Sequence, residues 1–441
     1  MKLATFRGGV HPDDGKSLAK DCPIQALLPG NELVFPLSQH IGAPAVPVVK
    51  KKDTVLMGQR IAEAGGFVSA NIVSSVSGVV KNLEPRLTVS GVKVNSIIIE
   101  NDGNYTPVEG LGVKRDMDSM SKQEILTAVK DAGIVGLGGA GFPTHVKLSP
   151  KDPDAIDYII VNGAECEPYL TADYRLMIEQ PEKLVGGLKA MLKLFDNAKG
   201  VIAIENNKPD AIASVQKAAA GEERIEVRPL KTKYPQGAER NLIFAVTGRK
   251  INSTKLPADA GCIVDNVDTV VSTYMAVAES TPLMRRIFTA TGEGIEKPAN
   301  YEVKIGMSFA EIAEASGGLK EGTTKIIAGG PMMGMAMSSL DVPVGKTNSA
   351  LLALLKDEAA EYEETACINC GRCVDVCPSR LVPKMMMDAA ERFDKESFIA
   401  LNGMECYECG SCTYACPAKR PLTQGFKQMR QAVMADRRKK K

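Results

Sequence analysis

The stretch CINCGRCVDVCP, residues 367–378, has the spacing C-x2-C-x2-C-x3-C-P, and the same spacing recurs as CYECGSCTYACP at residues 406–417. It is typical of bacterial dicluster iron–sulfur domains, in which cysteine thiolates hold [4Fe–4S] clusters. In such pairs of runs, the fourth cysteine of each run ligates the cluster of the other run. We therefore predict two clusters with crossed ligands. The first is assigned to Cys367, Cys370, Cys373 and Cys416, and the second to Cys406, Cys409, Cys412 and Cys377.

Zinc and disulfides are the alternatives for these cysteines. Zinc sites usually take two C-x-x-C pairs a dozen or more residues apart and need neither a third cysteine nor a Cys-Pro ending. Eight of the eleven cysteines lie in the two runs, and Cys22, Cys166 and Cys262 are far apart in the sequence. The sequence therefore indicates no disulfide framework. We interpret Cys22 and Cys262 as small buried hydrophobic residues.

Composition narrows the class of protein. The 441 residues carry 54 Lys and Arg against 53 Asp and Glu, a net charge of +1, which argues against nucleic acid as a bulk electrostatic partner. The start, MKLATFRGGVHP, has no apolar signal core, and no apolar run reaches the roughly 18 residues of a membrane span. Together with the cysteine usage this favours a reducing cytoplasm. The basic end RRKKK is interpreted as a solvated helix C-terminus, with contact to anionic lipid as the alternative.

Hydrophobic patterning divides the chain into four parts. Residues 1–115 are rich in Val, Gly and Pro and favour short strands joined by tight turns. Residues 116–282 alternate helix and strand, beginning with a helix capped by Ser121 and Glu124, which predicts a parallel sheet with crossover helices. Residues 283–345 read as strand, strand, helix, strand, a small α+β unit. Residues 346–441 begin with an acidic helical lead, KDEAAEYEET at 356–365, and contain both cysteine runs.

Four polar or glycine-rich stretches in the second part indicate a ligand site. GLGGAGFPTHVK (136–147) satisfies G-x-G-x-x-G, but a helix and at most a short strand precede it, so it is not an ordinary dinucleotide fingerprint. Its glycines still expose backbone N–H groups to a flat ring or a phosphate. NGAECEPY (162–169), YPQGAER (234–240) and DNVDT (265–269) follow segments with apolar content. Parallel sheets bind ligands at the carboxyl ends of their strands. Tight turns and surface loops are the alternatives.

These stretches resemble the flavin- and NADH-binding segments of the complex I flavoprotein subunit. The whole chain, from about residue 5 to 425, resembles more closely the RnfC family, the peripheral subunits of the membrane Rnf complex. The additional matches are FRGGVHP (6–12), VSSVSG (73–78), GGPMMG (329–334) and the paired cysteine motifs. The resemblance implies an N-terminal barrel-sandwich β module, a Rossmann-like FMN/NADH-binding domain, a β-grasp domain of the SLBB type and a C-terminal ferredoxin-like domain with two [4Fe–4S] clusters. The chain is thus expected to combine α/β and α+β domains.

The resemblance also implies site residues. It places Lys147 at the FMN phosphate, Phe142 against the NADH adenine, and Glu167 at the adenine ribose. The residues it assigns to non-covalently bound FMN are Gly136, Gly138, Gly139, Lys147, Asn162, Glu165, Gly237, Asn266 and Thr269. Those it assigns to NADH are Phe142, Glu167 and Glu239.

The sequence departs from the related flavoproteins at three places. Asp265 stands where the relatives have the first asparagine of their NNVET motif, Ala238 replaces an acid, and STKLP (253–257) replaces a nucleotide-side K-P-P-F-P stretch. These differences bear more on NADH contact than on FMN. An FMN/iron–sulfur cobalamin reductase shares the flavin segments and both clusters, and a non-catalytic electron-relay adapter is a further alternative. The N-terminal module with FRGGVHP favours the RnfC family.

The combination of cofactors predicts a function. A nicotinamide transfers two electrons as a hydride and a cubane transfers one at a time, so a flavin has to stand between them. The expected activity is exchange of a hydride between NAD(H) and FMN and relay of single electrons through two clusters, in a ferredoxin:NAD+ oxidoreductase coupled to Na+ or H+ movement. The resemblance implies the iron–sulfur subunit RnfB and the membrane subunits RnfD and RnfG as partners. It also implies a peripheral position on the cytoplasmic face of the cell membrane.

Overall fold

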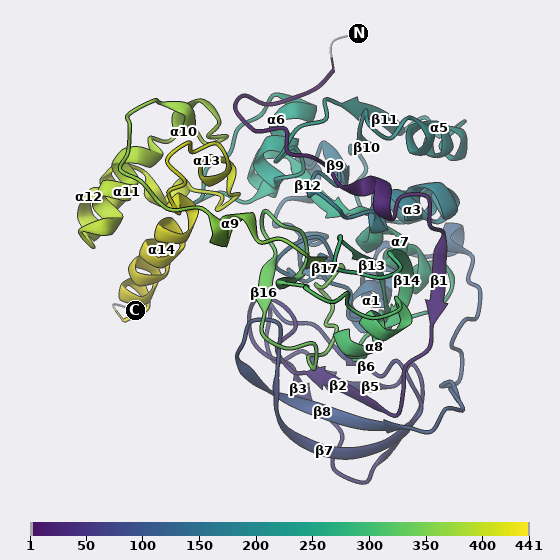
Figure 1. Ribbon diagram of the computed structural model, residues 1–441. Coiled ribbons are helices and arrows are strands. Elements are labelled where there is room, and N and C mark those ends of the chain that lie inside the picture. Colours follow the sequence, from purple (N-terminus) through teal and green to yellow (C-terminus); the bar gives the residue numbers. More distant parts are fainter. Residues whose placement is uncertain (1–2, 440–441) are drawn as a thin grey trace.

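The structure of the protein is a computed structural model, and it describes residues 3–439. Four sheets and a separate group of helices lie side by side (Figure 1). The N-terminal β module lies at one end, the α/β part at the other, and the six-stranded sheet between them. The cysteine-bearing helices project to one side of the α/β part. The predicted mixture of α/β and α+β units is confirmed.

The N-terminal module consists of short strands, as the Val-, Gly- and Pro-rich pattern predicts. Two antiparallel sheets enclose buried side chains, among them Leu33, Val55, Ile61 and Ile97. The first sheet has the order β2 (Glu32–Pro36), β8 (Lys93–Asn101), β7 (Gly78–Leu87), β4 (Thr54–Val55). The second has the order β3 (Val46–Pro47), β5 (Arg60–Glu63), β6 (Ile72–Val73).

The α/β part contains the predicted parallel sheet. All neighbouring strands are parallel, in the order β11 (Ile225–Leu230), β10 (Lys199–Glu205), β9 (Tyr158–Gly163), β12 (Cys262–Asn266). The helices that cover it are α1 (Lys122–Asp131), α3 (Ala172–Glu179), α4 (Pro181–Leu192), α5 (Pro209–Ala218), α6 (Glu239–Thr247) and α7 (Val267–Ala278). Helix α1 begins with the predicted capping box of Ser121 and Glu124. Because the strands are parallel, the loops that follow them meet at one edge.

The six-stranded sheet has the order β1 (Ile24–Leu27), β14 (Ala299–Lys304), β13 (Arg285–Thr291), β17 (Ala350–Leu354), β15 (Lys325–Ala328), β16 (Met335–Met337). Helix α8 (Phe309–Ala315) packs on it through Phe309, whose ring meets that of Phe288 edge-on at 5.3 Å. The strand–strand–helix–strand pattern of residues 283–345 is confirmed. Strands β1 and β17 join this sheet from outside that span, so the predicted bounds of the four domains stay predictions.

The cysteine runs lie among five helices: α10 (Arg372–Asp375), α11 (Pro383–Glu391), α12 (Lys395–Ala400), α13 (Ser411–Tyr414) and α14 (Leu422–Lys439). The acidic lead is helical only at α9 (Glu358–Glu361), a shorter helix than the sequence indicates. The basic residues at 437–439 are exposed at the end of α14, as expected, and residues 440–441 lie outside the described part of the chain. The remaining short helices are α2 (Thr144–Lys147) and the 3-10 turns Lys16–Leu18, Met117–Ser119, Pro153–Ala155, Pro257–Ala260 and Gly403–Glu405.

Residues 4–28, which we call the N-terminal strap, run outside the β module. The strap crosses the α/β part before it reaches the six-stranded sheet as β1 (purple in Figure 1). Ala4 pairs with Leu230 just at the end of β11, and Val10 and Tyr234 exchange two backbone hydrogen bonds of 2.8 and 2.9 Å. The strap therefore extends the α/β part along the loop that follows β11.

The strap also contacts the cysteine-bearing helices. The N–H of Gly9 donates to the carbonyl of Val376 at 2.8 Å. Gly8 and Gly9 have φ values of +81° and +84°, and a Cβ at Gly8 would lie 2.9 Å from the carbonyl oxygens of Val376 and Cys377. Glycine is needed at Gly8 both for the left-handed backbone and for this close approach. The FRGGVHP stretch thus holds the strap against the cysteine run at 367–378.

Candidate functional site

The carboxyl edge of the parallel sheet brings the four predicted stretches into contact in two pairs. Asn162, near the end of β9, donates from Nδ2 to the carbonyl of Gly237 at 2.9 Å. A Cβ at Gly138 would lie 2.9 Å from the Cβ of Asn266, which ends β12, so the glycine loop passes directly over that residue. Strand order explains this, because β9 and β12 are neighbours and their loops open on the same side.

Lys147 closes the glycine loop and is held by β12. Its Nζ donates to the carbonyl of Val264 at 2.7 Å and to Oδ1 of Asp265 at 2.9 Å. The Asp265 side chain is fully buried, and its Oδ2 has no hydrogen-bond partner. Burial raises the pKa of Asp265, and Lys147 opposes that rise. If Lys147 bound a phosphate, its ammonium group would contact both the phosphate and the carboxylate of Asp265.

Glu165 caps the following helix. Its Oε1 accepts hydrogen bonds from the N–H groups of Asp173 (2.7 Å) and Tyr174 (3.3 Å) in the first turn of α3, and its buried Oε2 has no hydrogen-bond partner. Asp173 in turn accepts from Nδ2 of Asn266 at 2.6 Å. Burial first, and then the charge of Glu165, raise the pKa of Asp173 to about 7. Sequence reasoning missed Asp173, which lies inside a helix with no motif around it.

Glu167 faces the GGPMMG turn of the six-stranded sheet. Its Oε1 accepts the N–H groups of Met332 (3.1 Å) and Met333 (2.6 Å), and its buried Oε2 has no partner. Burial raises the pKa of Glu167 to about 7. A Cβ on Gly330 would lie 2.1 Å from Cγ of Glu167, so only glycine allows this approach. Two predicted motifs, NGAECEPY and GGPMMG, are thereby joined.

The remaining predicted residues line or surround the glycine loop. The N–H of Gly136 donates to the carbonyl of Phe142 at 2.8 Å, and the half-buried Phe142 thus closes the loop on itself. The hydroxyl of Thr269 accepts the N–H of Leu137 at 2.9 Å. Glu239 begins α6 and is exposed. The three predicted NADH residues, Phe142, Glu167 and Glu239, all lie in the described part of the chain. No hydrogen bond joins any two of them there.

The chemistry of this edge fits a flavin mononucleotide. Gly138 and Gly139 are exposed, and a Cβ on Gly139 would meet nothing within 4 Å, so the loop borders open space. Glu165, Glu167 and Asp265 each have one buried carboxylate oxygen without a hydrogen-bond partner. Such oxygens are acceptors that require donors. The ribityl hydroxyls and ring N–H of FMN are donors, and Lys147 is a cation suited to its phosphate.

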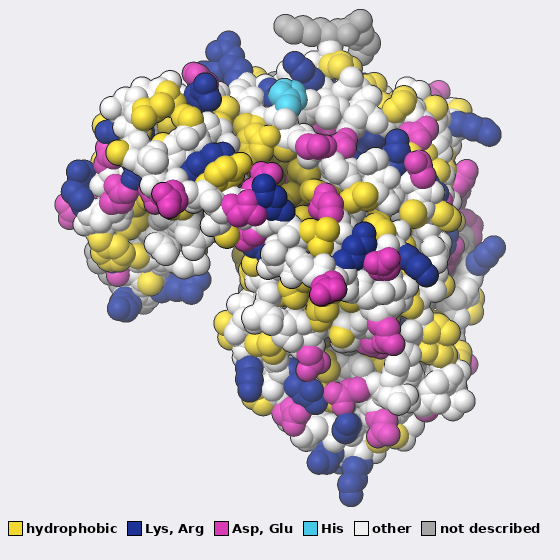
Figure 2. All heavy atoms as spheres, viewed as in Figure 1, with side chains coloured by type: hydrophobic (Ala, Val, Ile, Leu, Met, Phe, Trp, Pro, Cys, Tyr) yellow, Lys and Arg dark blue, Asp and Glu magenta, His cyan; other side chains and the backbone are white. Residues whose placement is uncertain are grey.

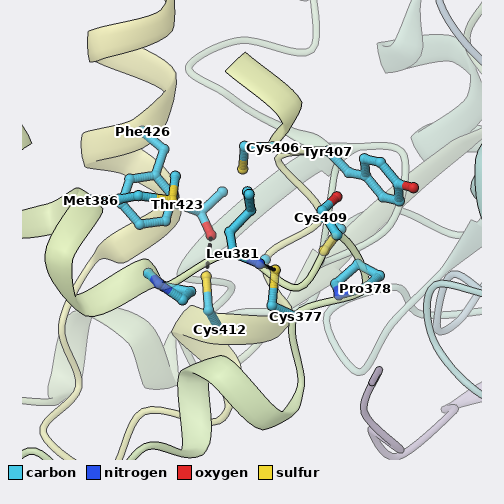
Figure 3. Close-up of a pocket in the computed structure, with 13 residues that line it drawn as sticks. Cys377, Pro378, Leu381, Met386, Cys406, Tyr407, Cys409, Cys412, Thr423 and Phe426 are labelled. Atoms are coloured by element: carbon cyan, nitrogen blue, oxygen red, sulfur yellow. Dashed lines mark hydrogen bonds between the residues drawn. The ribbon is translucent and has the colours of Figure 1, made fainter. Parts of the chain in front are cut away.

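The structure brings the cysteines together in the crossed pairing. Cys377 of the first run lies with Cys406, Cys409 and Cys412 of the second around one cavity (Figure 3). Four cysteine sulfurs around one cavity are the ligand set of a [4Fe–4S] cluster. Among residues 3–439, no three His, Cys, Asp or Glu side chains converge as for a single metal ion. Burial raises the pKa of Cys406 to about 11, so that a thiolate there requires bound cations.

The second cavity contains the complementary set. Cys416 of the second run lies with Cys367, Cys370 and Cys373 of the first around a separate cavity. Cys370 is exposed, and Ile368 on the same rim has 65% of its surface exposed. The first cavity lies toward the α/β part, whereas this one opens to solvent.

We call the carboxyl edge of the parallel sheet, with the glycine loop and the loops after β9, β11 and β12, the flavin-type edge. A small apolar cluster joins it to the first cavity. Tyr234 is buried and donates from its hydroxyl to the carbonyl of Cys409 at 2.7 Å. Cys166, between Glu165 and Glu167, accepts the N–H of Gly237 at 3.3 Å and packs in the same cluster with Met332. Hydrophobic atoms gather at this junction between the cysteine-bearing helices and the body (Figure 2). Sequence reasoning did not single out Tyr234, although it opens the YPQGAER stretch.

Comparison with known families assigns each part of the chain. Residues 4–104 match the RnfC barrel sandwich hybrid domain, and residues 129–275 match the Nuo51 FMN-binding domain. Residues 287–336 match the SLBB domain, and residues 366–419 match the 4Fe-4S dicluster domain. The expected FMN and iron–sulfur clusters are therefore confirmed as the cofactors of this chain.

Curated relatives decide the family. A subunit of the proton-translocating ferredoxin:NAD(+) oxidoreductase complex of Clostridium ljungdahlii is 46% identical over 87% of this chain and 84% of its own. The equivalent subunit of the Na(+)-translocating complex of Acetobacterium woodii is 44% identical over 100% of this chain and 99% of its own. The chain belongs to the RnfC family. A Rhodobacter capsulatus relative, named as part of an ion-translocating oxidoreductase complex, is 39% identical over 100% of this chain and 85% of its own.

Solved structures of other proteins share the fold of this RnfC family chain. The crystal structure of an NAD+-reducing [NiFe]-hydrogenase in its H2-reduced state superimposes with a TM-score of 0.51 at 20% identity. The match covers 72% of this chain and 63% of the hydrogenase chain, and at this identity it concerns the fold alone. Within residues 3–439, no helix is long and apolar enough to cross a membrane. The protein is a flavin- and iron–sulfur-dependent oxidoreductase subunit.

Proposed function

We propose that this chain is the peripheral subunit of an Rnf complex that exchanges a hydride between NAD(H) and FMN and relays single electrons to its partners. The observation that carries the proposal is the direct contact of the flavin-type edge with a four-cysteine cavity through Tyr234 and Cys409. Bound FMN supplies the exchange between two-electron and one-electron transfer. The chain's own part is to orient the reactants and to exclude water.

Within the edge, five of the predicted FMN residues have roles that their contacts support. Lys147 holds the phosphate and Asp265 limits its free charge, because the two side chains are paired at 2.9 Å. Asn162 and Glu165 fix the loop after β9 by hydrogen bonds to Gly237 and to the first turn of α3. The exposed backbone of Gly138 and Gly139 leaves room for the ring system.

The surroundings of the two cavities support an order for the two clusters. The cysteines 377, 406, 409 and 412 hold the cluster next to the flavin, because their cavity adjoins Tyr234. The cysteines 367, 370, 373 and 416 hold the outer cluster, because their cavity opens to solvent at Cys370. Electrons therefore enter or leave the chain at the outer cavity, where a partner protein has to dock. Cluster potentials vary over roughly a volt with environment, so the direction of flow is set by the partners.

We infer that the docking partners are the iron–sulfur subunit RnfB and the membrane subunits RnfD and RnfG, on the cytoplasmic face of the cell membrane. The support is the family membership, since the relatives from Clostridium and Acetobacterium are named as subunits of ion-translocating complexes. The exposed outer cavity is the face that suits such a partner.

Anaerobic reduction of the purified protein tests the function. In a stopped-flow experiment NADH should bleach the flavin absorbance first, and the cluster absorbance should follow. Iron analysis should give about eight iron atoms per chain for two cubanes. A protein that holds both clusters and FMN but whose flavin NADH does not bleach would be a relay adapter instead.

A further inference from the structure

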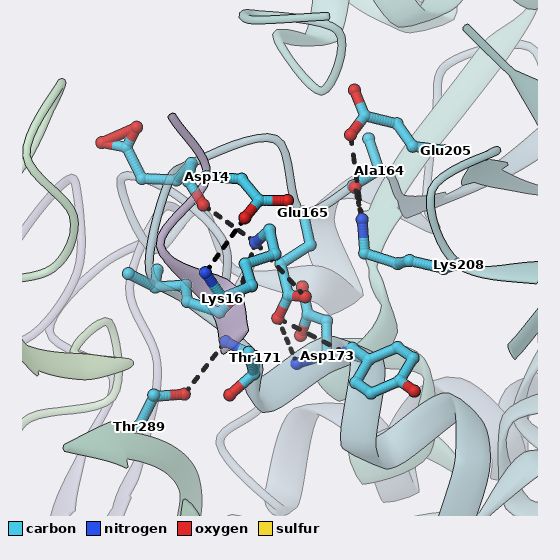
Figure 4. A network of polar contacts seen from close by, with 12 residues as sticks. Asp14, Lys16, Ala164, Glu165, Thr171, Asp173, Glu205, Lys208 and Thr289 are labelled. Atoms are coloured by element: carbon cyan, nitrogen blue, oxygen red, sulfur yellow. Dashed lines mark hydrogen bonds and ion pairs between the residues drawn. The ribbon is translucent and has the colours of Figure 1, made fainter. Parts of the chain in front are cut away.

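Lys16, in the N-terminal strap, reaches the flavin-type edge from outside the α/β part. Its Nζ donates to the carbonyl oxygens of Glu167 (3.0 Å) and Leu170 (2.5 Å). It also lies 3.8 Å from Oε2 of Glu165 (Figure 4). Only 9% of its side chain is exposed. A buried ammonium group has lost its water and needs protein partners. Two carbonyls and a carboxylate serve as those partners here.

The segment that Lys16 holds is a strained turn. Residues 165–170 contain two non-glycine residues in the left-handed region, Glu165 at φ +44° and Tyr169 at φ +69°. Such conformations are costly and persist only where surrounding contacts impose them. Lys16 binds two carbonyls of the turn, and the carbonyl of Asp14 accepts the N–H of Tyr169 at 2.6 Å. The strap therefore supplies contacts that hold this turn in place.

Gly15 shows how closely the strap fits the same turn. Its φ is +54°, and a Cβ there would come within 2.6 Å of the ring of Tyr169. No other residue type would let the strap pass at this distance without displacing the ring. Three successive strap residues thus pack against the turn that carries Glu165 and Glu167. They are Asp14, Gly15 and Lys16.

Lys16 also contributes charge to the edge. Glu165 and Glu205 are buried acids, and Lys208 lies 3.8 Å from Oε2 of Glu205 and donates to the carbonyl of Ala164 at 2.7 Å. Burial first, and then the charge of Lys16, lower the pKa of Lys208. The positive charges of Lys16 and Lys208 therefore repel one another, and Lys16 is the one that faces Glu165.

We propose that the N-terminal strap is a structural part of the flavin site and that Lys16 is its positioning residue. Lys16 holds the turn that presents Glu165 and Glu167, and it puts one buried positive charge beside Glu165. This inference rests on the proposed function, because it assigns a role within the flavin site. A fixed positive charge near a flavin favours its reduction, so the charge of Lys16 should raise the flavin midpoint potential.

Three variants separate the charge of Lys16 from its hydrogen bonds. Lys16→Met loses both, Lys16→Gln keeps a donor for the two carbonyls without the charge, and Lys16→Arg keeps the charge. Lys20→Met is the matched control, since Lys20 is an exposed lysine of the same strap. FMN affinity is measured by fluorescence titration of the flavin-free protein. The flavin midpoint potential is measured by anaerobic dye titration, and cluster content by iron analysis and EPR.

Lys16→Met should bind FMN about ten-fold more weakly, the effect of losing one to two kcal/mol of charged hydrogen bonding. Its midpoint potential should be lower than that of the wild type, with both clusters intact. Lys16→Gln should retain most of the affinity and show the lowered potential, and Lys16→Arg should restore the potential. Lys20→Met should match the wild type in all three measurements.

Wild-type FMN affinity and midpoint potential in Lys16→Met would overturn the proposal, even if that variant melted earlier, because the role would then be structural only. Should Lys16→Met fail to fold, Lys16→Gln decides, and an unchanged midpoint potential in it overturns the proposal. Failure of the proposed function is distinguishable. In that case the wild-type protein itself would bind no FMN, or its bound flavin would not be reduced by NADH.

Discussion

The hydroxyl of Tyr234 donates a 2.7 Å hydrogen bond to the backbone carbonyl of Cys409. Tyr234 belongs to the loop after β11 in the α/β part. Cys409 lines the first cavity, that of Cys377, Cys406, Cys409 and Cys412, which we call the inner cavity. The same tyrosine is paired through its backbone with Val10 of the strap. One side chain thus fixes the inner cavity against the carboxyl edge of the parallel sheet, and its removal is the most direct way to loosen that junction.

Tyr234→Phe should slow electron transfer between the flavin and the clusters while leaving hydride transfer unchanged. The variant loses one buried hydrogen bond and leaves the carbonyl of Cys409 without this donor, which costs about 1–3 kcal/mol. Stopped-flow absorbance separates the two steps. Tyr414→Phe is the control, because Tyr414 is a 52% exposed tyrosine of the cysteine-bearing helices. Equal cluster reduction rates in wild type and Tyr234→Phe would show that the contact does not set the junction.

Lys147→Ala should weaken FMN binding by roughly ten- to a hundred-fold, because a charge-assisted contact contributes about 1.5–3 kcal/mol. The single variant also leaves Asp265 buried without its partner, a cost of about 3–5 kcal/mol in other proteins. The double variant Lys147→Ala/Asp265→Asn removes that second effect and isolates the phosphate contact. Asp265→Asn alone frees Lys147 and should bind FMN more tightly than the wild type. Fluorescence titration measures all three, and unchanged affinity in the double variant contradicts the assignment.

Glu167→Gln should remove a pH dependence of stability. The folded-state pKa of Glu167 is raised to about 7, above its ordinary 4.5, so the folded protein binds more protons than the unfolded chain between these values. The contribution of Glu167 to stability is therefore lost as pH rises through that window. The glutamine can still accept the two methionine N–H groups.

Urea unfolding at pH 5 and pH 8 measures the difference. Glu167→Gln should gain up to about 3 kcal/mol relative to the wild type between these two pH values. Glu223→Gln, which alters an exposed carboxylate, is the control. Parallel pH profiles of wild type and Glu167→Gln would mean that Glu167 ionises in the folded protein as it does in the unfolded chain.

Phe142→Ala should raise the KM for NADH while FMN stays bound, because the ring is half-buried at the loop that borders the open space. A ring that served only as core would instead cost about 3–5 kcal/mol of stability on truncation. Steady-state kinetics and a thermal melt on the same preparation distinguish the two. An unchanged KM together with a large drop in melting temperature would remove Phe142 from the nucleotide site.

The crossed pairing of the cysteines predicts which variants resemble one another. Cys377→Ala and Cys406→Ala should perturb the same [4Fe–4S] signal in low-temperature EPR, since both residues line the inner cavity. Cys416→Ala and Cys367→Ala should perturb the other signal, because they line the outer one. A Cys377→Ala spectrum that reproduces that of Cys367→Ala would show that each run ligates its own cluster.

Local patterns in the sequence were enough for much of this fold. The alternation of helix and strand in residues 116–282 predicted a parallel sheet, and the spacing of the cysteines predicted the sets that the two cavities contain. The sheet prediction is confirmed, and the cluster ligands stay a prediction whose residues share the two cavities. Both rest on periodicity and spacing, which are properties of neighbouring residues.

Other contacts could not be predicted because they join distant residues of unremarkable type. Lys16 meets Glu167 across 151 positions, and Glu167 meets Met333 across 166. The sequence assigned Lys147 to the FMN phosphate and marked Asp265 only as a departure from the relatives' motif. Their 2.9 Å pairing with one another depends on the register of β12 beside β9. Side-chain partners of this kind follow from packing and leave no local signal.

The N-terminal strap constrains how the chain is made. Ala4 pairs with Leu230, the side chain of Asn300 hydrogen-bonds the carbonyl of Ala19, and Gly9 donates to Val376. The residues of the strap therefore wait for partners that are synthesised up to 367 positions later, since the hydrogen bond from residue 9 ends at residue 376. Domains usually fold in order during synthesis, but this contact cannot form until the first cysteine run has emerged. Cluster assembly and docking of the strap thus belong to the same late stage of biogenesis, and a large fusion at the amino end would interfere with both.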